Sequence, residues 1–137
     1  MAEIIERGKI RNREQAKQLR DFSQLRWGNI TPTDIDAYFE MNNQIFVFIE
    51  IKYGSKEMLR GQALALERLV DVVGETKDAI LIIGSHDYTP ETDIDAGFCK
   101  VKKYRTRNEW RKPLREITVK EITDIFIKKM KEKNGTI

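Results

Sequence analysis

The sequence has very few of the residues that build disulfides and zinc sites. Cys99 and His86 are the single cysteine and the single histidine among its 137 residues. One thiol cannot close an internal disulfide, so we expect an intracellular protein of the cytoplasm, or of the host cytoplasm for a viral protein. A metal ion would have to be held by carboxylates, and this favours Mg²⁺ or Mn²⁺ over Zn²⁺.

Long apolar segments are also lacking. No apolar run is longer than Ile45–Ile49, whereas a membrane helix needs about 20 apolar residues. The first ten residues mix charges with isoleucines, so we expect no secretory leader and no membrane partner. Because 40% of the residues are hydrophobic, there is enough apolar material for one core, and the length predicts a single domain over residues 1–137.

Positive charge is concentrated in two segments. Residues 7–20 contain six Lys or Arg and one acid, and residues 100–115 contain eight and one. Between them, Trp27–Ile51 has four acids and no basic residue. Basic segments of this density attract nucleic-acid backbones, although charge runs also serve as solvated surface. We predict that the following residues bind DNA: Arg11, Arg13, Lys102, Lys103, Arg105, Arg107, Arg111 and Lys112.

Hydrophobic periodicity predicts helices that alternate with strands. The expected hairpin turn is Asn42-Asn43, and Thr118 with Glu121 forms a capping box at the start of the last helix. This order predicts an α/β fold, with one mixed sheet flanked by helices and a C-terminal helix. The other predicted elements are a helix at 12–22, strands at 35–41 and 44–53, a helix at 57–73, a strand at 79–84 and an edge strand at 97–104.

Two charged side chains end the most apolar predicted strand. Glu50 and Lys52 are two residues apart, so they point to the same face of the sheet. Asp36 opens the neighbouring strand, and Asp34 lies on the same face as Asp36. Carboxylates this close repel one another unless a cation lies between them, and oxygen ligands suit Mg²⁺. Such an ion activates water and stabilises charge on a phosphate, and Lys52 would orient that water.

The series Asp36…Glu50-Ile51-Lys52 resembles the signature of the PD-(D/E)XK nuclease superfamily, whose members include restriction-type and Holliday-junction-resolving enzymes. The resemblance covers roughly residues 12–85. It implies a restriction-endonuclease-like domain with an αβββαβ core. An isolated Glu-x-Lys is more often an exposed ion pair, but the hairpin spacing and the following helix favour the nuclease interpretation here.

Other positions follow the family pattern less closely. Gln62 matches a glutamine that faces the active site in several branches, although it fits a residue at the edge of a helix equally well. Glu14 corresponds weakly to a first-helix acid used in other branches. The family's proline directly precedes the aspartate, whereas Pro32 is separated from both Asp34 and Asp36. Both aspartates therefore stay candidate ligands, with Asp36 preferred because a strand follows it.

Together these observations predict a Mg²⁺- or Mn²⁺-dependent endonuclease that hydrolyses DNA phosphodiester bonds. By analogy with junction resolvases, we expect structure-selective cleavage of branched DNA by a homodimer, as in DNA recombination. The alternatives are a non-catalytic nucleic-acid-binding module and a protein-interaction module on a nuclease fold. The expected catalytic residues are Asp36, Glu50, Lys52 and Gln62, and the expected metal ligands are Asp36, Glu50, the carbonyl of Ile51 and Asp34.

Overall fold

The computed structural model describes residues 21–135, and the chain divides into two compact units, residues 1–32 and 33–137. In the first unit, Trp27 and Ile30 exchange main-chain hydrogen bonds of 3.0 and 2.8 Å and so form a short turn. The helix predicted at residues 12–22 lies mostly outside the described residues. Its last two positions, Asp21 and Phe22, are not helical.

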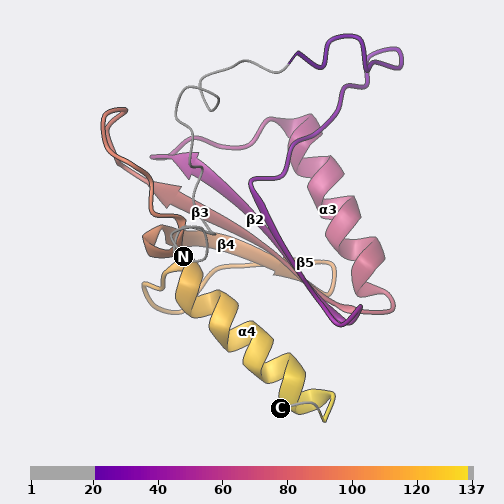
Figure 1. Cartoon of the computed structure of the whole chain (residues 1–137), viewed down its shortest axis with the longest axis vertical. Helices are drawn as coiled ribbons and strands as arrows, with labels where there is room; N and C mark the ends of the chain where they lie inside the picture. The colour runs from indigo at the N-terminus through magenta and orange to yellow at the C-terminus, as the bar shows by residue number, and fades with distance from the viewer. Residues whose placement is uncertain (1–20, 136–137) are drawn as a thin grey trace, which may run out of the picture. The chain divides into compact units, whose positions relative to one another are not determined.

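Within the described residues, the second unit contains a five-stranded mixed sheet (Figure 1). β2 and β3 run parallel, and the other neighbouring strands run antiparallel. A parallel pair needs a crossover connection, which the helix α3 (Arg60–Gly74) provides. The strands lie side by side in chain order: β1 (Ala37–Met41), β2 (Ile45–Tyr53), β3 (Asp78–His86), β4 (Lys100–Thr106) and β5 (Glu109–Arg111).

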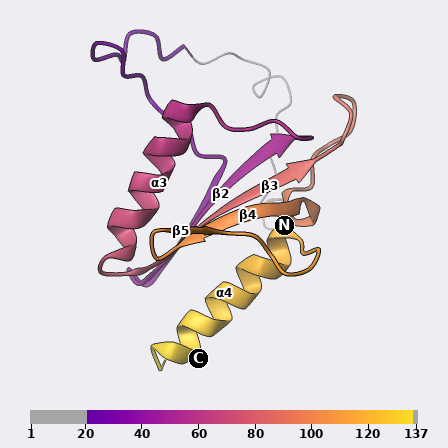
Figure 2. The same cartoon turned by 180° about the vertical axis from the view of Figure 1, so that it is seen from behind.

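The helices α3 and α4 (Val119–Lys133) cover opposite faces of this sheet, as Figures 1 and 2 show from two sides. Leu66 and Val70 of α3 belong to one apolar core, and Ile122 of α4 belongs to the other. Successive strand residues point to opposite faces, so the unbroken apolar runs of β2 and β3 contribute to both cores. Neither helix is long and apolar enough to cross a membrane.

The hairpin turn and the last helix agree with the sequence prediction. Asn42 and Asn43 form the turn with φ of 53° and 54°, a left-handed conformation that asparagine tolerates better than most residues. The Thr118 hydroxyl accepts the main-chain N–H of Glu121 at 3.1 Å, and the Glu121 carboxylate accepts that of Thr118 at 3.1 Å. This capping box is present as predicted.

The predicted α/β class, with a mixed sheet and a C-terminal helix, is confirmed. The element order αβββαβ is not confirmed by the described residues. Among residues 21–135, two strands precede α3 and three follow it. The strand predicted at 97–104 is present as β4, but it starts at Lys100 because residues 96–98 form a 3₁₀ helix. It is not an edge strand, because β5 pairs with its outer side. The β4–β5 turn contains Arg107 and Asn108 at positive φ. Arginine is not a typical residue of such turns, so the sequence gives little signal of it.

Candidate active site

Asp36, Glu50 and Lys52 lie near the carboxyl end of β2, on the sheet face that α3 covers. The register of β1 on β2 pairs Ala37 with Ile49, which puts Asp36 opposite Glu50. The main-chain N–H of Asp36 donates to Oε1 of Glu50 at 3.2 Å, and Oδ2 of Asp36 accepts the main-chain N–H of Ile51 at 2.7 Å. The hairpin therefore brings together the two acids that the sequence predicts as neighbours.

Glu50 is buried to an unusual degree for an acid, with 1% of its surface exposed. Its Oε2 accepts a hydrogen bond from Nε2 of Gln62 at 3.0 Å. Burial raises the pKa of Glu50 to about 7, the neighbouring Asp36 adds to this rise, and the positive charge of Lys52 opposes it. The site thus lacks the positive charge needed to keep Glu50 fully ionised at neutral pH.

Gln62 connects the lysine to the acids. It lies in the first turn of α3, and its Oε1 accepts a hydrogen bond from Nζ of Lys52 at 3.0 Å. Its Nε2 donates to Glu50 and also lies 3.4 Å from Oδ1 of Asp34. The sequence does not decide whether Gln62 is a residue at the edge of a helix or a residue of the site. In the structure its side chain contacts both Lys52 and Glu50.

The start of α3 adds positive potential beside these residues. The helix begins at Arg60, three residues later than the sequence predicts, after Leu59, which makes no side-chain cap. The first turn of α3 contains no acid. The first N–H groups of a helix have no partners within it and carry partial positive charge. Because Gln62 in this turn touches Glu50, the positive end of the helix lies next to the carboxyl groups.

The donors at this site suit a hard divalent cation. Asp36 and Glu50 offer carboxylate oxygens, and the main chain of Ile51 adjoins Asp36. In the part of the chain that the structure describes, no group of three or more His, Cys, Asp or Glu side chains is arranged to hold a metal, and Asp34 reaches the site through Gln62. Mg²⁺ is commonly held by one or two carboxylates while it keeps several waters. It would also supply the positive charge that the buried Glu50 lacks.

Two of the basic residues predicted to bind DNA, Lys102 and Lys103, lie on the α3 side of the sheet, and Nζ of Lys103 is 4.3 Å from the centre of the Trp110 ring. Nζ of Lys102 is 3.3 Å from the carbonyl oxygen of Lys56 and 3.7 Å from Oε1 of Glu57, both in the connection that leads into α3. Lys103 lies in one cross-strand row with Glu50, because both pair with Ile83 of β3. Residues in such a row share a face of the sheet.

Arg105, by contrast, is held in an ion pair between β4 and α3. Its guanidinium donates hydrogen bonds of 2.9 and 2.7 Å to Asp71, and its side chain is 14% exposed. The bond to Asp71 raises the pKa of Arg105, and the charge of Glu67 adds to the rise. Glu67 and Asp71 are four residues apart and share a face of α3, which is the sequence signal for this interaction. The guanidinium is therefore not available to a phosphate as the sequence predicts.

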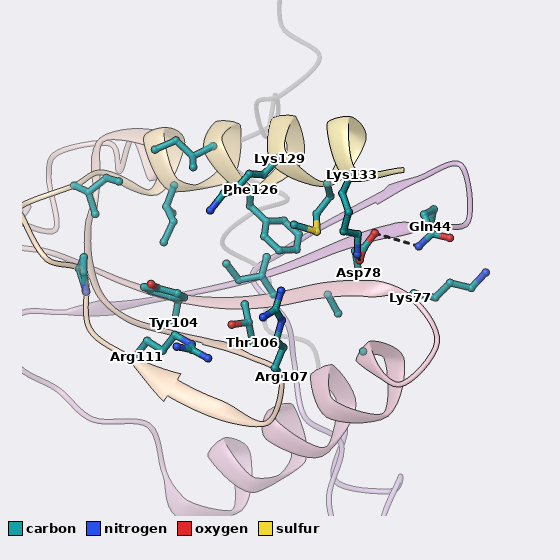
Figure 3. Close-up of a pocket in the computed structure, with 18 of the residues that line it drawn as sticks. Gln44, Lys77, Asp78, Tyr104, Thr106, Arg107, Arg111, Phe126, Lys129 and Lys133 are labelled. Carbon is teal, nitrogen blue, oxygen red and sulfur yellow. Dashed lines mark hydrogen bonds and ion pairs between the residues drawn. The ribbon is translucent and has the colours of Figure 1, made fainter. Parts of the chain in front are cut away.

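The remaining basic residues of the prediction are elsewhere. Arg107 and Arg111 line a groove on the α4 side of the sheet, as Figure 3 shows. Lys112, just after β5, is exposed. Arg11, Arg13 and the weak candidate Glu14 lie outside the described residues. The predicted DNA-binding residues that are described are therefore divided between the two faces of the sheet.

Comparisons with known proteins add no family assignment. No family model, no curated protein and no solved structure matches this chain. The resemblance to PD-(D/E)XK nucleases therefore stays a prediction from the sequence.

Proposed function

We propose that this protein is a metal-dependent nuclease that hydrolyses DNA phosphodiester bonds. The observation that carries the proposal is the buried Glu50, which lies opposite Asp36 and shares Gln62 with Lys52. A buried acid without a matching cation destabilises a fold. Such an arrangement is therefore expected where a bound cation compensates for the cost and where the site has a chemical task.

Each residue has a distinct task in this proposal. Asp36 and Glu50 would hold the ion, with the carbonyl of Ile51 and, as an additional ligand, Asp34. Bound Mg²⁺ supplies an activated water and stabilises the charge that develops on the phosphate. Gln62 fixes the amine of Lys52 beside Glu50, where Lys52 would orient the attacking water or donate to a phosphate oxygen.

The surroundings of the site favour a polyanionic substrate. The uncapped start of α3 lies beside the carboxyl groups, and helix starts bind phosphates through their free N–H groups. Lys103 lies two strands away from Glu50 in the same row, about 10 Å at the usual strand spacing. Lys103 would therefore contact a phosphate that follows closely along the DNA strand after the one at Glu50. The preference for branched DNA and the homodimer are part of this proposal.

Cleavage assays with purified variants test the proposal. Junction, flap, duplex and single-stranded DNA are incubated with Mg²⁺, Mn²⁺ or EDTA. We expect cleavage by the wild type with either metal, and none in EDTA. Glu50→Gln and Lys52→Ala should abolish it, whereas Glu132→Gln, on an exposed position of α4, should not. Cleavage by Glu50→Gln at the wild-type rate would show that the assigned site is wrong.

One observation favours a non-catalytic DNA-binding protein as the second candidate. Within the described residues, the site brings together two acids, Asp36 and Glu50, and no third acidic side chain completes a metal-binding group. A binding protein would show salt-dependent affinity for DNA and no cleavage with either metal. In that case Glu50→Gln should bind DNA as tightly as the wild type or more tightly, because it removes a carboxylate that faces phosphates.

A further inference from the structure

A groove of about 770 Å³ lies on the sheet face opposite Glu50, between α4 and the β4–β5 hairpin. Figure 3 shows Phe126 and Lys129 on α4 and, across from them, Tyr104, Thr106 and Arg107 on the hairpin. The volume is within the range of small-molecule sites. Nothing in the proposed nuclease activity uses this face.

The interior of the groove is apolar and mostly aliphatic. Ile80 of β3 and Ile122 of α4 are buried at its base. Phe126, Met130 and Tyr104 are partly buried and pack against the same core. The edge of a base would need several hydrogen-bond partners, and the single side-chain amide of the lining, Gln44, already donates to Asp78 at 3.1 Å. The interior therefore suits a hydrocarbon chain better than a nucleotide base.

The rim of the groove is strongly basic, with six Lys or Arg residues against Glu75 and Asp78. Asp78 already accepts hydrogen bonds from Gln44, Lys133 and Asn134, and these bonds from Lys133 and Asn134 lower its pKa against the effect of burial. The basic residues of the rim are Lys77, Arg107, Arg111, Arg115, Lys129 and Lys133.

Of the six rim cations, Lys133 pairs with Asp78, and Figure 3 shows the side chain of Lys77 directed away from the groove. Two of the other four are available to a ligand. Arg111 pairs with Glu109 at 2.9 Å, and Arg115 lies 3.5 Å from Glu121. Within residues 21–135, neither Arg107 nor Lys129 forms an ion pair, although both line the groove beside Phe126. An apolar cavity with unpaired cations at its mouth is complementary to a molecule with an apolar body and an anionic head.

We propose that this groove binds a long-chain carboxylate. The hydrocarbon chain would lie against Phe126, Met130 and Ile122, and the carboxylate would contact Arg107 and Lys129. A second copy of the protein is a poor occupant, because two basic rims placed face to face repel each other. The proposal is independent of the nuclease activity.

Fluorescence titration tests the proposal on the full-length protein. The dye 1-anilinonaphthalene-8-sulfonate, which has an apolar body and one anionic group, serves as the reporter, and dodecanoate displaces it. We expect saturable displacement by dodecanoate, and at least tenfold weaker displacement by uncharged dodecanol. The double variant Arg107→Gln/Lys129→Gln should bind dodecanoate at least tenfold more weakly.

The matched control changes the same residue types at exposed positions outside the groove. Arg68→Gln/Lys128→Gln should bind dodecanoate like the wild type, and urea unfolding shows that both double variants fold. Equal affinity of the groove variant and the wild type would overturn the proposal. Equal displacement by dodecanol and dodecanoate would also overturn it, and so would displacement by deoxyadenosine monophosphate alone.

Discussion

Glu50 is a residue whose ionisation the fold makes costly. Its carboxyl group is almost fully buried, and its two hydrogen-bond donors are the neutral N–H groups of Asp36 and Gln62. Lys52 lowers the cost, but burial and Asp36 prevail, and the pKa of Glu50 rises to about 7. A proton and a divalent cation would therefore compete for the same oxygens, so binding of the metal should release a proton near neutral pH.

The raised pKa predicts how the stability of the metal-free protein depends on pH. In the unfolded chain Glu50 ionises near its ordinary pKa of 4.5, whereas in the folded protein it ionises at about 7. The folded state thus binds the extra proton between these values, and the free energy of unfolding should fall as pH rises through this window. The effect is on the order of 3 kcal/mol. Asp78, whose pKa is lowered, titrates below the window.

Urea unfolding in EDTA at pH 5 and pH 8 measures this effect. The wild type should lose stability between the two values, and Glu50→Gln, which cannot ionise, should lose much less. Saturating Mg²⁺ should reduce the loss in the wild type, because the bound ion compensates for the carboxylate charge. An equal loss in the wild type and in Glu50→Gln would show that Glu50 does not have the raised pKa.

Gln62 gives a second prediction at the scale of the residue. Gln62→Ala removes the hydrogen bonds to Lys52 and to Glu50 but leaves both charged groups in place. Removing such a supporting hydrogen bond typically costs 10- to 100-fold in activity, so we expect a decrease of about that size in the rate of DNA cleavage. Gln44→Ala is the matched control, because it removes a comparable amide bond, to Asp78. Equal rates for the two variants would contradict the positioning role of Gln62.

At the scale of the elements, the sequence predicts best where local signals suffice. The capping box at Thr118, the Asn42-Asn43 turn and the doubly apolar strand before Glu50 each depend on a few neighbouring residues. From these signals the opposition of Asp36 and Glu50 follows directly. The strand β5 has three residues and a turn that starts with Arg107, so it carries almost no local pattern. The spacing of Glu67 and Asp71 shows that they share a face of α3, but no local pattern shows that their partner is Arg105, 34 residues beyond Asp71.

Gly84 links three elements and allows a further prediction. It lies where the pairing of β3 with β4 is irregular, and a Cβ atom there would be 2.8 Å from Cγ2 of Val119 at the start of α4. Gly84→Ala should therefore push α4 from the sheet and lower the free energy of unfolding by about 1–3 kcal/mol. Gly61→Ala is the control: its Cβ would meet no atom within 4 Å, and alanine favours the helix, so stability should be unchanged or rise by up to about 1 kcal/mol. Urea unfolding measures the free energy of unfolding of both variants, and an equal stability of Gly84→Ala and the wild type would contradict the prediction.

At the scale of the second unit, the sheet separates two surfaces of different chemistry. The face under α3 carries the buried acid Glu50 and the lysines Lys52 and Lys103. The face under α4 carries the apolar groove with its basic rim. One basic segment of the sequence, residues 100–115, contributes to both, because the strand alternation and the turn at Arg107 direct its side chains to different sides. The net charge of residues 100–115 alone therefore cannot predict which of these residues bind the same ligand.

This division predicts which cations bind DNA. If the substrate lies along the α3 face, Lys102→Gln/Lys103→Gln should weaken DNA binding and reduce the slope of log affinity against log salt by up to about 0.9 for each phosphate that the variant no longer neutralises. Arg107→Gln/Arg111→Gln removes the same charge from the α4 face and should leave the slope unchanged. Fluorescence anisotropy with a labelled DNA junction, in EDTA over a range of salt concentrations, measures both variants. A larger change in the second variant would place the DNA on the α4 face, which is too far around the sheet from Glu50 for the proposed site to act on it.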